Sequence, residues 1–222
     1  MEKDRLQMSE SFALAAMLAI VGGFLDAYSY ILRGNVFANA QTGNIVLLGI
    51  CFQKGEIRKG IYYLIPITAF AMGVILVEVV KKRYKKEEKI HWRQRILALE
   101  IFLLLIVGMI PLGAMDVAAN ILISFVCAMQ VETFRKVHGH PFASTMCTGN
   151  LRSGTESFWQ YFQTGDKRLC QKGMKYYGII VCFIVGAVAG AILSENIGKQ
   201  AVFICCGLLA AAMAVMVKEY RI

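Results

Sequence analysis

Two Thr-Gly-Asn triplets are the residues whose types and spacing most suggest chemistry. Thr42-Gly43-Asn44 and Thr148-Gly149-Asn150 stand 106 residues apart. Glycine permits backbone conformations that are closed to other residues, and Thr or Asn at a helix start can cap its free N–H groups. An uncapped helix start near a membrane midplane instead offers its positive dipole end to a negative or polar substrate group. Capping is a structural role and ligand binding a functional one, and the sequence leaves both open.

Charged residues accompany both triplets. Asp26 precedes the first triplet at the offset at which Glu132 precedes the second, and Arg152 follows the second triplet. A charged side chain at the centre of a membrane helix costs about 2.5–3.5 kcal/mol on insertion scales, so it is usually paired or functional. Asp26 could therefore bind a proton, a cation or a substrate amine, or pair with Arg33 or Arg152. Arg152 favours an anionic or polar ligand, unless it snorkels to the membrane interface.

The predicted substrate-binding residues are the polar or small residues around the triplets together with these charges. They are Asp26, Asn39, Gln41, Thr42, Gly43, Asn44, Glu132, Thr148, Gly149, Asn150 and Arg152. Gln41 has no polar counterpart in the second segment, where Met146 and Cys147 stand, so the two half-sites differ chemically. We expect the other membrane carboxylates, Glu78, Glu100 and Glu195, to lie at helix ends or at the membrane interface.

The sequence predicts no catalytic residues, no metal site and no cofactor. It contains no HExxH, GxSxG or Walker-type loop, and its seven cysteines include no CxxC pair. We therefore expect the protein not to be an enzyme. The net charge of +9 does not indicate a nucleic-acid partner, because no folded nucleic-acid-binding pattern accompanies the basic residues.

Long apolar stretches must position these residues. Hydrophobic types make up 57% of the 222 residues and charged types 18%, which disfavours a soluble enzyme, a disordered tail or a coiled coil. Eight stretches are apolar: Phe12–Leu32, Val36–Phe52, Gly60–Val80, Ile96–Met115, Val117–Phe134, Phe142–Phe162, Gly173–Leu193 and Gln200–Val217. Six of them are long enough to span a membrane, which takes about 20 residues. The second and sixth, which contain the triplets, begin with polar residues, and the helix after Asn44 has only about ten residues, or about 15 Å.

The stretches form an internal duplication. Phe37–Asn44 matches Phe142–Asn150, and later helices share a Gly-x4-Glu ending at Gly73–Glu78 and Gly190–Glu195. Residues 1–95 are expected to hold the first repeat, with two spans, one re-entrant segment and a basic linker at 81–95. Residues 96–222 are expected to hold the third span and the second, inverted repeat, all within one membrane domain. Such repeats are typical of transporters.

The distribution of the 24 basic residues favours this arrangement. If all eight stretches span the membrane, 11 basic residues lie inside and 12 outside, which is no bias. If each triplet segment instead enters and leaves the membrane on the same side, 18 basic residues lie inside and 5 outside. This excess inside is what the positive-inside rule requires. Three spans per half then place the two halves in opposite orientations, with both termini cytoplasmic. The alternative is that both triplet segments are tilted, glycine-rich helices packed against neighbours.

Gly186-x3-Gly190 allows close helix packing, either within the chain or between chains.

A family resemblance adds to this pattern. At Gly22–Tyr30, followed by Phe37–Asn44, the chain resembles the YoaK family of bacterial inner-membrane proteins. The resemblance runs from Ser9 to the last helix and implies a polytopic bacterial membrane protein. It supplies neither a substrate nor functional residues.

The sequence thus predicts an all-α polytopic membrane protein with six transmembrane helices and two broken, re-entrant segments. The leading hypothesis is a small-solute transporter or channel of the bacterial inner membrane, with a midplane polar site between the two triplets. The alternatives are a membrane-embedded scaffold or sensor, or a lipid-modifying protein without transport. The expected partners are the lipid bilayer, a small polar or anionic solute and a second copy of the chain.

Overall fold

The computed structural model describes residues 11–84, 92–137, 140–141 and 147–220. Helices dominate these ranges, with a two-residue antiparallel ladder and one 3-10 turn besides. The elements are α1 (Phe12–Leu32), α2 (Gln41–Gln53), α3 (Ile57–Tyr84), α4 (Trp92–Met109), α5 (Asp116–Thr133), β1 (Lys136–Val137), β2 (His140–Pro141), α6 (Cys147–Thr164), α7 (Lys167–Ile197), η2 (Gly198–Ala201) and α8 (Val202–Tyr220).

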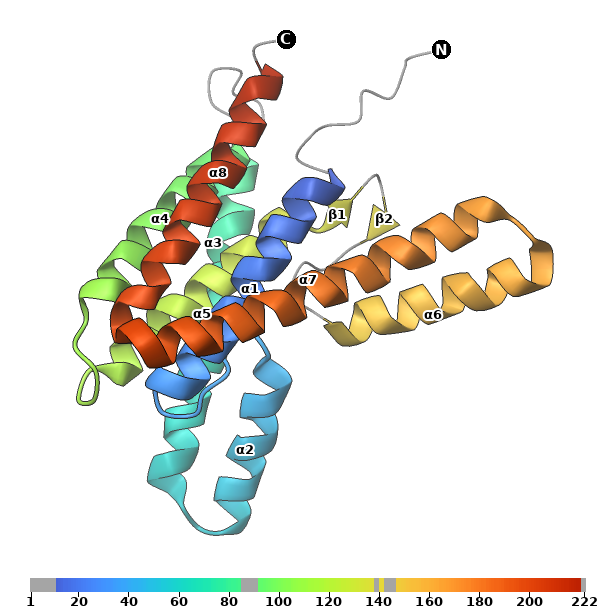
Figure 1. The fold of residues 1–222 in the computed structure, drawn as a ribbon. Coiled ribbons are helices and arrows are strands. Elements are labelled where there is room, and N and C mark those ends of the chain that lie inside the picture. The colour runs from blue at the N-terminus through green and yellow to red at the C-terminus, as the bar shows by residue number, and fades with distance from the viewer. Residues whose placement is uncertain (1–10, 85–91, 138–139, 142–146, 221–222) are drawn as a thin grey trace.

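A central bundle and two arms make up the molecule (Figure 1). The bundle contains α1, α4, α5, α8 and the later part of α3, and its largest apolar cluster is built from these helices. One arm pairs α2 with the beginning of α3, and the other pairs α6 with the beginning of α7. Both α2 and α6 begin near the centre of the molecule and run outward to the tip of their arm.

Glycines allow α1 and α7 to lie in backbone contact. A Cβ atom at Gly186 would collide with the carbonyl oxygen of Ile20, and one at Gly190 would lie 2.7 Å from that of Phe24. The Gly186-x3-Gly190 pair therefore serves close packing within the chain. At the far end of α7, Gly198 adopts a positive φ of 60°, which turns the chain through η2 into α8.

The contacts between helices also fix their relative directions. Arg33 at the end of α1 pairs with Asp116 at the start of α5, and Gln130 near the end of α5 donates to the carbonyl of Leu18. The two helices are therefore antiparallel. α4 and α8 are antiparallel as well, because Gly108 late in α4 adjoins Phe203 early in α8.

Two further pairs run parallel. In the first pair, Ile20 and Phe24 of α1 meet Gly186 and Gly190 of α7 in the same order. In the second pair, Tyr62 of α3 bonds to Asn120 of α5, and Gly73 adjoins Ala128 further along both helices.

Four described stretches are long and apolar enough to cross a membrane. They are residues 12–32, 57–84, 116–133 and 167–216, the last of which includes both α7 and α8. The chain is therefore a helical protein with several candidate spans, and the predicted count of six stays a prediction. α4 has 18 residues and carries Arg93, Arg95 and Glu100, which keep it outside this set.

The predicted basic linker at 81–95 overlaps helices at both of its ends. Residues 81–84 continue α3 as a regular helix, and α4 begins at Trp92. A run of Lys and Arg can extend a helix beyond its apolar part, because these residues have good helix propensity and favour the negative end of the helix dipole. Residues 85–91 lie outside the described part of the chain.

Candidate functional site at the start of two short helices

Asp26 is the centre of the first predicted half-site. It lies in α1 with 6% of its surface exposed, and its Oδ1 accepts a hydrogen bond of 2.8 Å from the backbone N–H of Asn39. The backbone N–H of Ala40, the residue before α2, also donates to this carboxyl group. Ser29 supports the same loop, because its hydroxyl accepts from the N–H of Ala38. A carboxylate of α1 thus binds the free N–H groups at the entrance of α2, where the helix dipole favours negative charge.

Asn44 of the first triplet fixes the loop before α2. Its Nδ2 donates to the carbonyl of Phe37 at 2.7 Å and to Oε1 of Gln41 at 3.0 Å, and its Oδ1 accepts from the N–H of Phe37. Gln41 in turn donates to the carbonyl of Ala38. The N-cap residue Ala40 makes no side-chain cap hydrogen bond, and Asn44 bonds to Phe37 and Gln41, so the triplet holds the loop by its third residue and does not cap the helix. This gives Asn44 a structural role.

The other two residues of the first triplet have different surroundings. Thr42 is exposed. Gly43 makes room for Phe37, since a Cβ atom there would lie 3.0 Å from the phenyl ring. That ring stacks on Tyr30 with centroids 4.8 Å apart, so a larger residue at position 43 would displace this aromatic pair.

The second triplet stands in the first turn of α6. Thr148 and Gly149 are exposed, whereas Asn150 is buried. Cys147, the first residue of α6, is half-buried and lies within electrostatic range of Asp26. The beginnings of α2 and α6 therefore both lie close to one carboxyl group of α1. Residues 142–146, which the sequence comparison matched to the loop before α2, lie outside the described residues.

The remaining predicted residues do not join this cluster. Glu132 lies at the end of α5, where it pairs with Arg135 at 3.1 Å and lies against Glu78 of α3. Arg152 is exposed on α6, two residues after the triplet. Asn39, Gln41 and the first triplet therefore gather around Asp26, the second triplet begins nearby, and Glu132 has separate partners.

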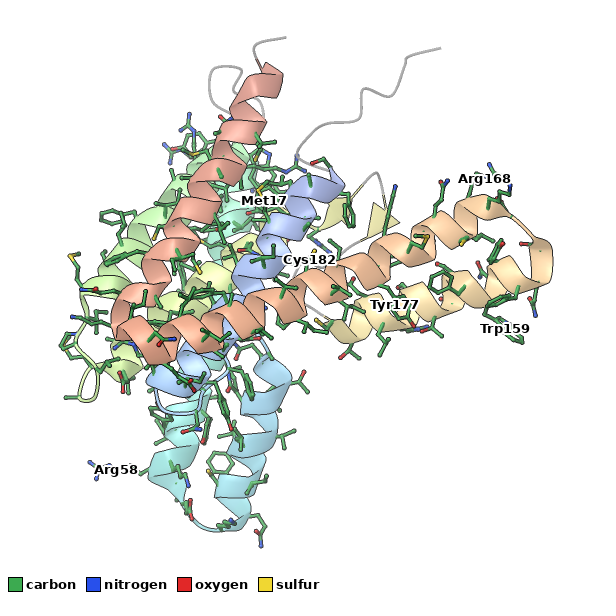
Figure 2. The ribbon with its side chains drawn as sticks, viewed as in Figure 1. Met17, Arg58, Trp159, Arg168, Tyr177 and Cys182 are labelled. Atoms are coloured by element: carbon green, nitrogen blue, oxygen red, sulfur yellow. The ribbon has the colours of Figure 1, made fainter. Side chains whose placement is uncertain are left out.

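α6 carries a continuous polar stripe. Residues three or four apart on a helix share a face, and one exposed face of α6 holds Thr148, Arg152, Glu156, Gln160 and Gln163. Other exposed positions on α6 are apolar, with Leu151 at 49%, Trp159 at 64% and Phe162 at 78% exposure. Leu151 and Phe162 lie on the side of the helix opposite Gln160, whereas Trp159 follows Arg152 by seven residues and lies beside the stripe. Figure 2 shows Trp159 on the outer side of α6 and Tyr177 between α6 and α7. The polar stripe runs from the second triplet to the tip of the arm.

α2 differs from α6 on its exposed side. Beyond Thr42, the exposed residues there are mostly apolar and include Ile45, Val46, Ile50 and Phe52. The predicted chemical difference between the two half-sites thus extends along the whole of both helices.

Sequence reasoning missed the partners of Arg33, which it counted among the basic residues outside the membrane and considered as a partner of Asp26. Arg33 is fully buried and pairs with Asp116 at 3.0 Å. Its guanidinium also donates to Tyr28 and to three carbonyl oxygens at and just after the end of α4, those of Val107, Ile110 and Pro111. The sequence offered one signal for this pair: Arg33 follows the end of one apolar stretch, and Asp116 precedes the start of another.

Glu100 is fully buried within the protein, which the sequence does not predict. The packing of α4 against α5 and α8 covers this residue, and that packing cannot be deduced from a single helix. The expected place of Glu100 near the membrane interface stays a prediction.

Comparison with known proteins assigns the chain to a family. The family described as "Protein of unknown function (DUF1275)" matches residues 14–215. The chain belongs to this family. The UPF0700 transmembrane protein YoaK of Bacillus subtilis (strain 168) is 28% identical over 191 residues, which are 82% of this chain and 84% of that protein. No solved structure matches. This DUF1275 protein is thus a multi-pass helical membrane protein, in agreement with the resemblance noted in its sequence.

Proposed function

We propose that this DUF1275 protein is a small-solute transporter or channel of the bacterial inner membrane. Its two halves are inverted repeats, α1–α4 and α5–α8, and its site lies where α2 and α6 begin. The observation that carries the proposal is Asp26, a buried carboxylate that binds the entrance of α2 and lies within electrostatic range of the start of α6. Broken helices that meet near the midplane are typical of transporter sites.

The pairing of the helices supports the inverted repeat. The first helix of each half packs on the third helix of the other, as α1 on α7 and α5 on α3. The second and third helices of each half form the two arms, and the matching pairs α1·α5 and α4·α8 are antiparallel. Opposite directions are expected of inverted repeats, whereas parallel repeats would align them. The boundary of the first repeat then falls after α4 rather than at residue 95.

The lengths and surfaces of α2 and α6 support re-entry. α2 has 13 residues, or about 20 Å at 1.5 Å per residue, which is shorter than a bilayer core of about 30 Å. Exposed Arg, Glu and Gln side chains on α6 are not stable against lipid, so they require water or protein beside them. We infer that the polar stripe of α6 lines an aqueous route between the arm tip and the second triplet. Both termini are then cytoplasmic, as the charge distribution predicts.

The proposed solute is small and polar or anionic. Asp26 is occupied by the N–H groups at the entrance of α2, so its role is to hold that helix start in position. Arg152 is the exposed cation closest in sequence to the second triplet, and it would attract a negative or polar group along the stripe. No cofactor, metal or catalytic step is part of this proposal.

Cysteine accessibility on two faces of α6 tests the route. After the native cysteines are replaced, Thr148→Cys and Gln160→Cys on the polar stripe should react with a membrane-impermeant thiol reagent. Leu151→Cys and Phe162→Cys are matched controls, because they are exposed on the side of α6 opposite Gln160 and should be shielded by lipid. Equal reaction of all four would place α6 in water outside the membrane, and no reaction of the stripe would exclude an aqueous route. A scaffold, sensor or lipid-modifying protein predicts one of these two results.

A further inference from the structure

Glu100 is a buried acid without a partner among the described residues. It lies near the middle of α4 with 0% of its surface exposed. Neither of its carboxyl oxygens is within hydrogen-bond distance of a donor in the described part of the chain. No described cation forms an ion pair with it either. The two basic residues that precede it in α4 are engaged elsewhere, Arg93 with the carbonyl of Thr133 and Arg95 with the ring of Tyr84.

Apolar side chains surround this carboxyl group along α4. The positions one turn before and after it are Ile96, Leu97, Leu103 and Leu104, and three of these four are fully buried. α4 packs on α5 and α8, which contribute further buried aliphatic residues to the same cluster. The environment therefore cannot solvate a charge.

The titratable groups that face Glu100 from neighbouring helices are few. Cys127 of α5 is within electrostatic range of both Glu100 and Asp26. Cys206 of α8 donates weakly to the carbonyl of Ile101, the residue after Glu100, and Cys205 is within electrostatic range of Cys127. From α3, Tyr84 reaches α4 through its contact with Arg95, and Lys199 of η2 bonds to the carbonyl of Met109 at the opposite end of α4. None of these groups compensates a negative charge on Glu100.

A proton is the ligand that fits this site. An ionised carboxylate in such surroundings is so costly that the group takes up a proton instead. A hard metal cation would need several oxygen ligands around it, and the described residues contain no group of three or more His, Cys, Asp or Glu side chains that could hold a metal ion. A proton needs only one of the two carboxyl oxygens.

We propose that Glu100 is an intramembrane proton-binding site, protonated while α4 is packed against α5 and α8 and deprotonated when that packing opens. Cys127 is within electrostatic range of both Glu100 and Asp26, which links the proton site to the proposed solute site. If the proposed transport function holds, release of this proton couples solute movement to a proton gradient. This coupling depends on the proposed transport function, whereas proton binding by Glu100 does not.

Infrared spectroscopy of the full chain in lipid nanodiscs tests the proposal without any solute. The C=O stretch of a protonated carboxyl group should be present at neutral pH, and its Glu100 component should be lost in Glu100→Gln. Glu156→Gln on the exposed stripe of α6 is the matched control and should keep the band. Asp26→Asn identifies any separate contribution from that carboxyl group. If Glu100→Gln does not fold, Glu100→Asp should shift the band to a different frequency.

Two results would overturn the inference. Identical neutral-pH spectra for wild type and Glu100→Gln would mean that Glu100 holds no proton. A Glu100 band that persists unchanged from acid to alkaline pH would remove the release step. If the band behaves as expected but no solute moves, the proposed function fails while the proton site stands.

Discussion

Arg33 should be one of the most sensitive positions in the fold. Its buried guanidinium makes hydrogen bonds of 3.0–3.2 Å to Asp116, Tyr28 and three carbonyls around the end of α4. Its own carbonyl accepts from Tyr62 and Asn120, so one residue joins α1, α3, α4 and α5. Removing one partner of a buried charge pair typically costs about 3–5 kcal/mol, because the other charge is left buried without compensation. We expect Arg33→Met to lower the free energy of unfolding by about this amount.

Reversible unfolding in mixed detergent micelles, followed by circular dichroism, measures this loss. Asp116→Asn removes the opposite charge, and the double variant Arg33→Met/Asp116→Asn should lose less stability than the sum of the single variants. Arg58→Met is the matched control, because Arg58 is exposed at the outer end of an arm (Figure 2) and should change stability by no more than about 0.5 kcal/mol. A loss below about 1 kcal/mol for Arg33→Met, the value of a surface ion pair, would refute the structural role assigned to this residue.

Three further changes test the packing, the loop and the pH response. Gly186→Leu should destabilise the protein by about 1–3 kcal/mol in thermal melts because its side chain would meet the backbone of Ile20, whereas Gly207→Leu, with no atom nearby, should not. Asn44→Ala should cost about 1–3 kcal/mol through the unsatisfied backbone of Phe37 and should speed hydrogen exchange in the loop before α2; unchanged exchange would contradict the loop role. Asp166 caps α7 by accepting from the N–H of Arg168, and its hydrogen bonds with Arg168 lower the pKa of its carboxyl. The stabilisation is therefore present above the unfolded-state pKa and is lost as pH falls through the folded-state pKa, so Asp166→Ala should lower Tm at neutral pH but not at strongly acidic pH.

Local sequence signals anticipated part of the structure around Asp26. The polar start of an otherwise apolar stretch predicted a short helix after Asn44, and α2 begins three residues earlier, at Gln41. A carboxylate inside an apolar helix predicted a residue with a specific partner, and Asp26 has one in the backbone of Asn39. These features are visible in sequence because they depend on contrasts between neighbouring residues.

The roles of Arg33 and Glu100 depend on distant segments instead. Arg33 meets carbonyl groups that lie 74–78 residues away along the chain, and no local pattern specifies that meeting. Glu100 is buried because α5 and α8 cover α4, which only the assembled bundle determines. The sequence could not decide whether the triplet caps α2 either, because the hydrogen bonds of Asn44 depend on how the preceding loop folds back.

The sidedness of the two arm tips tests the central claim most directly. Lys54 lies exposed at the end of the α2 arm and Thr164 at the end of the α6 arm. In a cysteine-free background, Lys54→Cys and Thr164→Cys would be labelled with an impermeant thiol reagent in intact cells and in inside-out vesicles. Inverted repeats with re-entrant α2 and α6 predict that Lys54→Cys reacts only from outside and Thr164→Cys only from inside. Labelling of both positions from the same side would contradict the inverted arrangement, and with it the site between the two helix starts.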